Sequence, residues 1–148
     1  MTGPFARIVS ILGLMVLFSA PPAAAGDNPE ASPNASPKAR ALIERQLEAL
    51  GRDDAAGAYA LAAPAIRTKF IDPEGFLAMV REKYAPVYRH RGVAFGDATD
   101  DGDKISQLLT IVDNDDKVWS ALYQLTRQPD GTWLISGCVL IRAPETST

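Results

Sequence analysis

The clearest structural pattern is in the stretch KVWSALYQLTRQPDGTWLISGCVLIR, residues 117–142, where large apolar residues alternate with smaller or polar ones on both sides of a turn. Alternation with a period of two is typical of β-strands. The tripeptide Pro-Asp-Gly at 129–131 interrupts the alternation and has the composition of a hairpin turn. The stretch therefore predicts two antiparallel strands, at 117–127 and 132–142.

The length of this turn determines which residues share a face of the sheet. A three-residue loop pairs odd positions with odd positions and places Leu125 opposite Ile135. By the same count, Tyr123 lies opposite Gly137. We expect the face toward the helices to carry the odd-numbered residues of both strands: Trp119, Ala121, Tyr123, Leu125, Trp133, Ile135, Gly137, Val139 and Ile141.

Two further strands are predicted upstream, at 87–97 and 104–113. A three-residue loop at 114–116 places Ile111 opposite Trp119. The even-numbered face is half apolar, and its charges are confined to strand ends and turns: Ser106, Leu108, Thr110, Val112, Ser120, Leu122, Gln124, Ser136, Cys138 and Leu140. We expect a second copy or a neighbouring segment to cover it, the alternative being an ordinary exposed face rich in Ser and Thr.

Three helices are predicted before the strands. The first begins after Ser36 as N-cap, with Pro37 at its first position, and Gly51 closes it. The second opens at Asp53 and Asp54. The third has Asp72 as N-cap, and Pro86 stops it. Helices followed by strands indicate an α+β domain over 38–143, with three helices packed on a curved four-stranded antiparallel sheet and a tail at 144–148.

The amino-terminal residues have the pattern of a secretory signal peptide. An apolar run at 8–20 follows Arg7, and small residues at 23–25 provide a cleavage site. The run rises only about 20 Å as a helix, which is too short to span a membrane. We expect 1–25 to be removed, 26–37 to be a disordered tether, and the protein to be periplasmic or secreted with no stable membrane insertion.

Composition and charge exclude several classes of function. The 148 residues carry a net charge of −3, so the strongly basic surface of a nucleic-acid-binding protein is not expected. The acidic loop at 97–103 lacks the ligand spacing of a calcium site. His90 and Cys138 are the only His and Cys of the sequence, and neither has a recognisable catalytic partner. We therefore predict no metal, no cofactor and no catalytic residue.

One combination of residues is more specific: Arg52 to Ala56 with Ala63, Pro64 and Ile66, then Met79, Val80, Tyr84 and Pro86 to Arg89, then Trp133, Ile135, Ser136 and Gly137. It resembles an uncharacterised exported bacterial family, domain of unknown function 4864. The order of elements also resembles the nuclear transport factor 2-like fold. That likeness implies a cone with a pocket between helices and sheet, but it carries over no catalytic residue.

We expect a non-enzymatic module that binds a small apolar or amphipathic molecule, or a partner peptide, inside the cone. The expected lining consists of aromatic residues and one methionine: Tyr59, Phe70, Phe76, Met79, Tyr84, Tyr123 and Trp133. One alternative is a cavity enzyme using acid/base proton transfer through Glu82 or Asp97. The other is a structural homodimer with a filled core.

Overall fold

The computed structural model describes residues 32–145, so the predicted signal peptide at 1–25 and the first half of the predicted tether lie outside the described residues. The helices are α1 (Pro37–Gly51), α2 (Ala55–Ala60), α3 (Pro64–Arg67), α4 (Pro73–Lys83) and α5 (Ala85–Tyr88). The strands are β1 (Gly92–Asp100), β2 (Lys104–Val112), β3 (Val118–Arg127) and β4 (Trp133–Arg142). None of these helices is long and apolar enough to cross a membrane.

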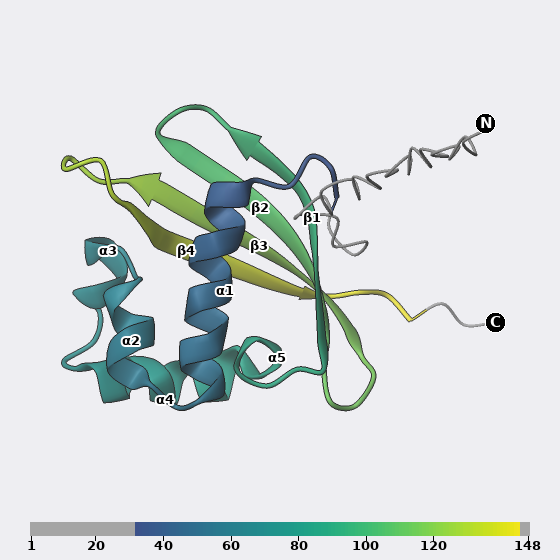
Figure 1. The fold of residues 1–148 in the computed structure, drawn as a ribbon. Coiled ribbons are helices and arrows are strands. Elements are labelled where there is room, and N and C mark those ends of the chain that lie inside the picture. The colour runs from purple at the N-terminus through teal and green to yellow at the C-terminus, as the bar shows by residue number, and fades with distance from the viewer. Residues whose placement is uncertain (1–31, 146–148) are drawn as a thin grey trace, which may run out of the picture.

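The helices cover one face of a single antiparallel sheet with the strand order β1-β2-β3-β4 (Figure 1). α1 crosses the sheet, and α2 and α4 lie beside its lower half in this view. The core lies between the two layers and includes Ile43, Leu77, Leu109, Ile111 and Leu125. The expected α+β class is confirmed, with three longer helices and two of four residues over the curved sheet.

The helix starts follow the sequence signals, but two of the predicted ends do not. Ser36 Oγ accepts a hydrogen bond from the N–H of Ala39, and Asp72 Oδ1 accepts one from Gly75. α1 includes Gly51 without a left-handed turn there, because Asp53 adopts the positive φ of 57° instead. Asp53 therefore adopts the left-handed backbone conformation that was expected of Gly51.

Pro86 does not end the helical part of the chain. It occupies the second position of α5, where proline needs no N–H partner, and α4 has already ended at Lys83. β1 accordingly begins at Gly92, five residues later than predicted from the alternation. Residues 87–91 belong to α5 and the turn that follows it.

Both predicted three-residue hairpin loops are present. The N–H of Asp113 donates to the carbonyl of Lys117 over 2.9 Å, and Ile111 pairs with Trp119 as expected. The N–H of Gln128 donates to the carbonyl of Thr132 over 2.7 Å, which encloses the loop at 129–131. Leu125 pairs with Ile135, which confirms the register of β3 and β4 next to this turn.

Farther from the turn, a β-bulge reverses the alternation of β4. Leu125 pairs with Ile135 but Gln124 pairs with Gly137, so Ser136 is the extra residue. Tyr123 therefore lies opposite Cys138, and the predicted pairing with Gly137 is wrong.

The bulge also corrects the predicted faces of β4. Val139 and Ile141 point to solvent with exposed fractions of 53% and 61%, although the alternation placed them on the helix-facing side. Cys138 and Leu140, predicted on the other face, pack against the core instead. One extra residue turns every later side chain of the strand over.

The second half of the predicted tether is ordered. The N–H of Ser32 donates to the carbonyl of Phe95 over 2.7 Å, and the N–H of Ala98 donates to Asn34 over 3.1 Å. The N–H of Ser36 donates to Oε1 of the fully buried Gln107 over 2.9 Å. Residues 32–36 therefore follow β1 across the irregularity in its pairing between Phe95 and Ala98, and the prediction of disorder is wrong there.

The connection between α2 and α3 contacts the opposite edge of the sheet, at strand β4. The N–H of Ile135 donates to the carbonyl of Leu61 over 2.8 Å, and the N–H of Ala63 donates to the carbonyl of Ile135 over 2.7 Å. Ala62 and Ile135 thereby form a parallel bridge. This contact joins the helical layer to β4 beside the bulge.

Candidate functional site

A pocket of about 390 Å³ lies between the helical layer and the sheet. Its walls come from α1, α3, α4 and α5, and its sheet side comes from β3 and the bulged part of β4. The lining residues are Gln46, Leu50, Ile66, Lys69, Phe70, Phe76, Met79, Val80, Lys83, Tyr84, Val87, Tyr123, Ile135, Ser136, Gly137 and Cys138. This is the size and largely apolar character of a small-molecule site.

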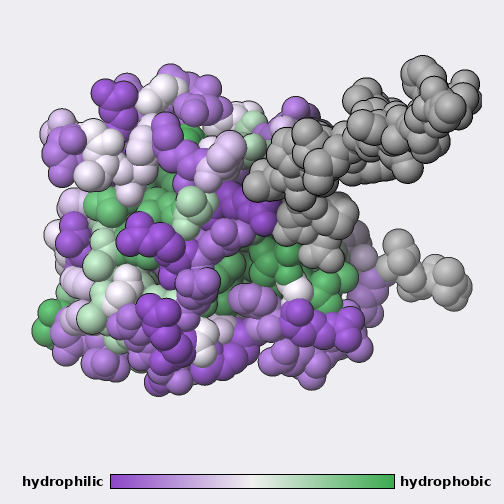
Figure 2. Space-filling model, viewed as in Figure 1, coloured by the Kyte–Doolittle hydropathy of each residue, from purple (hydrophilic) through white to green (hydrophobic). Residues whose placement is uncertain are grey.

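Hydrophobic residues are visible at the surface on the helix-bearing side, which indicates that the helices cover the apolar interior incompletely. Figure 2 shows hydrophobic residues in an interrupted band across the middle of this view, with hydrophilic residues above and below.

Five of the seven predicted lining residues lie in the pocket wall: Phe70, Phe76, Met79, Tyr84 and Tyr123. Tyr59 is outside it, where its ring packs on Phe76 with centroids 5.9 Å apart. Trp133 is also outside it, beneath the ammonium group of Lys38 at 4.8 Å from the ring centre.

Helical spacing explains the wall that α4 provides. Phe76, Met79, Val80 and Lys83 stand three or four residues apart, so their side chains share one face of the helix. The ring of Phe70 meets that of Phe76 edge to face at a centroid distance of 5.6 Å. The aromatic wall is thus held by ring contacts from both sides.

The inner wall is made by Tyr84, Tyr123 and Cys138. The hydroxyl of Tyr84 donates to the backbone carbonyl of Cys138 over 3.2 Å. Burial raises the pKa of the Tyr123 hydroxyl well above its usual range and raises the pKa of the Cys138 thiol to about 12. Both groups stay protonated at neutral pH, so Cys138 is not a thiolate nucleophile.

Four polar lining residues, Gln46, Lys69, Lys83 and Ser136, were not anticipated from the sequence. Gln46 is 5% exposed, and its amide nitrogen reaches the carbonyl of Ala58 at 3.4 Å. Both lysines are exposed at the ends of helical segments. Polar residues at such positions usually reflect ordinary solvation, so only the fold shows that these face a pocket.

The acidic residues considered for proton transfer are not among those that line the pocket. Asp97 accepts a hydrogen bond from the hydroxyl of Ser32. Asp72 caps α4 through Gly75, and Glu82 is exposed on the same helix. His90, the one histidine of the sequence, also lies outside the lining, and its Nδ1 is 3.1 Å from the carbonyl oxygen of Pro86.

No group of three or more His, Cys, Asp or Glu side chains within residues 32–145 is arranged to hold a metal ion. The acidic hairpin turns use their carboxylates on the backbone instead. Asp101 accepts from the N–H groups of Asp103 and Lys104, and Asp113 accepts from those of Asp115 and Lys117.

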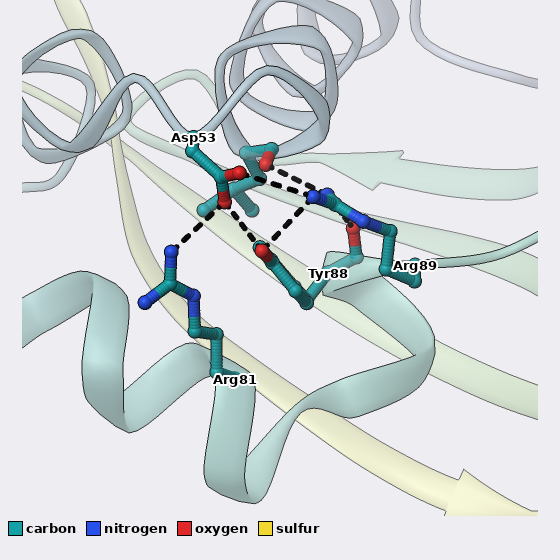
Figure 3. Close-up of polar contacts among 5 residues, drawn as sticks. Asp53, Arg81, Tyr88 and Arg89 are labelled. Atoms are coloured by element: carbon teal, nitrogen blue, oxygen red, sulfur yellow. Dashed lines mark hydrogen bonds and ion pairs between the residues drawn. The ribbon is translucent and has the colours of Figure 1, made fainter.

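A polar cluster fastens the turn after α1 to α4 and α5 (Figure 3). Asp53 accepts a hydrogen bond from the hydroxyl of Tyr88 and pairs with Arg81 at 3.0 Å and with Arg89 at 3.3 Å. The Tyr88 hydroxyl, followed by Arg81, holds the pKa of Asp53 below its usual value. Arg89 also donates to the carbonyl of Leu50 over 3.1 Å, at the end of α1.

The opposite face of the sheet carries exposed apolar side chains. Leu108, Leu122 and Val139 are neighbours across three strands. Leu108 is 41% exposed, and Val118 is 42% exposed. We call the surface formed by these side chains the outer apolar face; it consists of Leu108, Val118, Leu122, Val139 and Ile141.

The comparisons with known proteins address family and fold. A family model described as Domain of unknown function (DUF4864) matches residues 33–148, in agreement with the predicted resemblance. A crystal structure of an NTF-2-like protein of unknown function from Silicibacter pomeroyi DSS-3 is similar, with a TM-score of 0.50 and 14% identity over 72% of this chain and 93% of that one. This likeness confirms the predicted nuclear transport factor 2-like fold.

A second solved structure, Aln2 from a Streptomyces species, has a TM-score of 0.48 and 18% identity over 72% of this chain and 92% of that one. The search of curated proteins gave no match.

Proposed function

Because this chain belongs to the family described as Domain of unknown function (DUF4864), whose description assigns no activity, we propose a function from the pocket itself. The protein is an exported, non-enzymatic module that binds one small apolar or amphipathic molecule. The observation that carries this proposal is the pocket of about 390 Å³ with its aromatic and aliphatic lining. Such a volume accommodates a small molecule or a single large side chain of a partner peptide.

The chemistry of the lining favours binding over turnover. Proton abstraction in an apolar cavity requires a carboxylate or another base with a suitably shifted pKa. Among residues 32–145, no acid or histidine lines the pocket, and its buried thiol and the buried phenol of Tyr123 are held protonated. The cavity enzyme that the sequence left open would need Glu82 or Asp97 inside the pocket, and neither lines it.

Binding can be tested with the neutral fluorescent probe N-phenyl-1-naphthylamine. We expect saturable fluorescence enhancement, because the probe leaves water for the aromatic wall. Met79→Trp fills the pocket and should reduce the affinity at least about tenfold. Ala78→Trp is the matched control, since it places the same ring at an exposed position of the same helix. Absence of saturable binding, or equal loss in both variants, would contradict the proposal.

Export is the part of the proposal that rests on the amino-terminal sequence. The apolar run at 8–20 and the small residues at 23–25 support cleavage after Ala25. Intact-mass measurement of the protein recovered outside the cytoplasm should give a chain that begins at Gly26 or Asp27. Recovery of a chain that retains 1–25 would contradict it.

We further propose that the outer apolar face binds a second copy of this chain. Its apolar side chains come from three neighbouring strands, with Leu108, Leu122 and Val139 in one row. Polar positions in the middle of this face are uncharged, as at Thr110 and Ser120, so two copies meeting there bring no like charges together. A self-complementary patch of this kind is what a two-fold dimer requires.

A further inference from the structure

We propose that the pocket selects amphipathic anions, with an apolar body against the aromatic wall and an acidic group, such as a carboxylate, at Lys69 and Lys83. This inference rests on the proposed binding function and names the class of its ligand. The proposed function depends on the apolar residues of the wall, whereas this inference depends on the charged residues of the lining.

The charges that face the pocket all have one sign. The titratable lining residues are Lys69, Lys83, Tyr84, Tyr123 and Cys138. Burial keeps Tyr123 and Cys138 neutral, and the hydroxyl of Tyr84 is a donor to a backbone carbonyl. The lining that the described residues form therefore carries two positive charges and no negative charge at neutral pH.

The two lysines are available to a ligand. Within the described part of the chain, neither Lys69 nor Lys83 forms a salt bridge with an acidic side chain. Arg81, on the same helix as Lys83, is instead committed to Asp53. An anion at the lysines would not have to displace an existing ion pair.

The positions of the lysines suit a ligand with two ends. Lys83 follows Met79 by four residues and Val80 by three, so its stem shares their face of α4. Lys69 directly precedes the lining residue Phe70. Both lysines are exposed, whereas Phe76 and Val80 are buried, so the charges lie at the boundary between the apolar wall and water.

The rest of the molecule has the opposite charge balance. The whole sequence has a net charge of −3, so general electrostatics repel an anion rather than attract it. A measured preference for an anion would therefore report the local lining. This makes charge selectivity a specific test of the pocket.

The test is displacement of bound N-phenyl-1-naphthylamine by 1-naphthoate and by 1-naphthamide, which differ little in shape but differ in charge. At low salt we expect the carboxylate to bind tighter by about two- to fivefold for each lysine it reaches, as for exposed ion pairs. Lys69→Gln and Lys83→Gln should each lower this ratio. Lys104→Gln, an exposed lysine outside the lining, is the matched control and should leave it unchanged.

Salt provides an independent readout. Raising the ionic strength to about 0.5 M should make the affinities for 1-naphthoate and 1-naphthamide more similar, chiefly because salt weakens the binding of the carboxylate. Equal displacement by both compounds at low salt, or a ratio that neither pocket variant changes, would overturn the anion inference and leave the binding function standing. Failure of the neutral probe itself to bind would overturn both.

Discussion

The two faces of the sheet present different kinds of surface, although the residues that build them alternate along the same strands. On the helix-covered face Leu109 is fully buried, and the incomplete fit of helices to sheet leaves a small pocket. On the outer face the adjacent Leu108 is 41% exposed, and no helix of the described chain covers it.

One sheet thus offers two different candidate surfaces for recognition. The pocket has a small volume and two lysines in its lining, so we expect it to discriminate between ligands by size and charge. The outer apolar face is an open surface, so it favours a partner that covers a large area.

The largest difference is expected in stability. Leu109→Ala should lower the free energy of unfolding by about 2 to 5 kcal/mol, because it leaves a cavity in the core. Leu108→Ala removes the same atoms from a half-exposed position and should cost about 1 kcal/mol or less. Urea denaturation at low protein concentration measures both. Similar losses would mean that the outer face is covered in the isolated chain.

Thiol reactivity tests which way the bulge turns the end of β4. With a pKa of about 12 instead of the usual 9.0, Cys138 should react with Ellman's reagent at pH 8 roughly a thousandfold more slowly than an ordinary thiol. Thr132→Cys in a Cys138→Ser background supplies the reference, because position 132 is exposed in the hairpin turn. A Cys138 that reacts as fast as this reference would refute the inward orientation.

The outer face should respond to charge through association. We expect Val139→Lys to weaken self-association about tenfold or more, because it introduces a charge into an apolar contact. Sedimentation at micromolar concentration measures the effect. Thr132→Lys is the control, as it adds the same charge at the hairpin turn. A wild-type protein that is strictly monomeric under these conditions would refute the second-copy proposal.

The smallest effect is expected at the polar cluster of the helical layer. Tyr88→Phe removes the largest influence on Asp53, so the pKa of this carboxyl should rise toward 3.8. The folded pKa is depressed, so the stabilisation is present above pH 3.8 and is lost as the pH falls through the folded value.

Carboxyl NMR titration measures this pKa directly. Urea denaturation from pH 6 to pH 3 should show that the difference between wild type and Tyr88→Phe shrinks at acid pH. Tyr59→Phe is the matched control, because its hydroxyl donates to the backbone carbonyl of Arg67 and not to a carboxylate. An unchanged Asp53 titration in Tyr88→Phe would show that the hydroxyl does not set this pKa.

The hairpins show how far sequence reasoning reaches. Loop length gave the pairings of Ile111 with Trp119 and of Leu125 with Ile135, because turn geometry is local. The pattern failed beyond Ser136, where one added residue reversed the strand. Gly137 was the available signal, since an isolated glycine within a strand often accompanies a bulge.

The pocket was predictable in its apolar part and not in its charged part. Phe76 and Met79 belong to an amphipathic stripe, which is visible in the sequence. Lys69 and Lys83 look like ordinary solvated residues. Only the fold, which brings the end of α4 and the segment after α3 to the same pocket, places them beside the cavity. Likewise, nothing in the sequence distinguishes Asp53 from Gly51 as the left-handed residue.

The backbone contacts at the two outer strands bear on how this protein avoids aggregation. An unpaired strand edge is a template on which another chain can add a strand. Here residues 32–36 occupy part of the β1 edge, and the connection at 61–63 occupies the start of the β4 edge. Both outer edges of the sheet are therefore partly occupied, which shortens the run of β1 or β4 on which a foreign strand could pair. Without the contacts of Ser32 and Asn34, a longer part of the β1 edge would be open to strand addition.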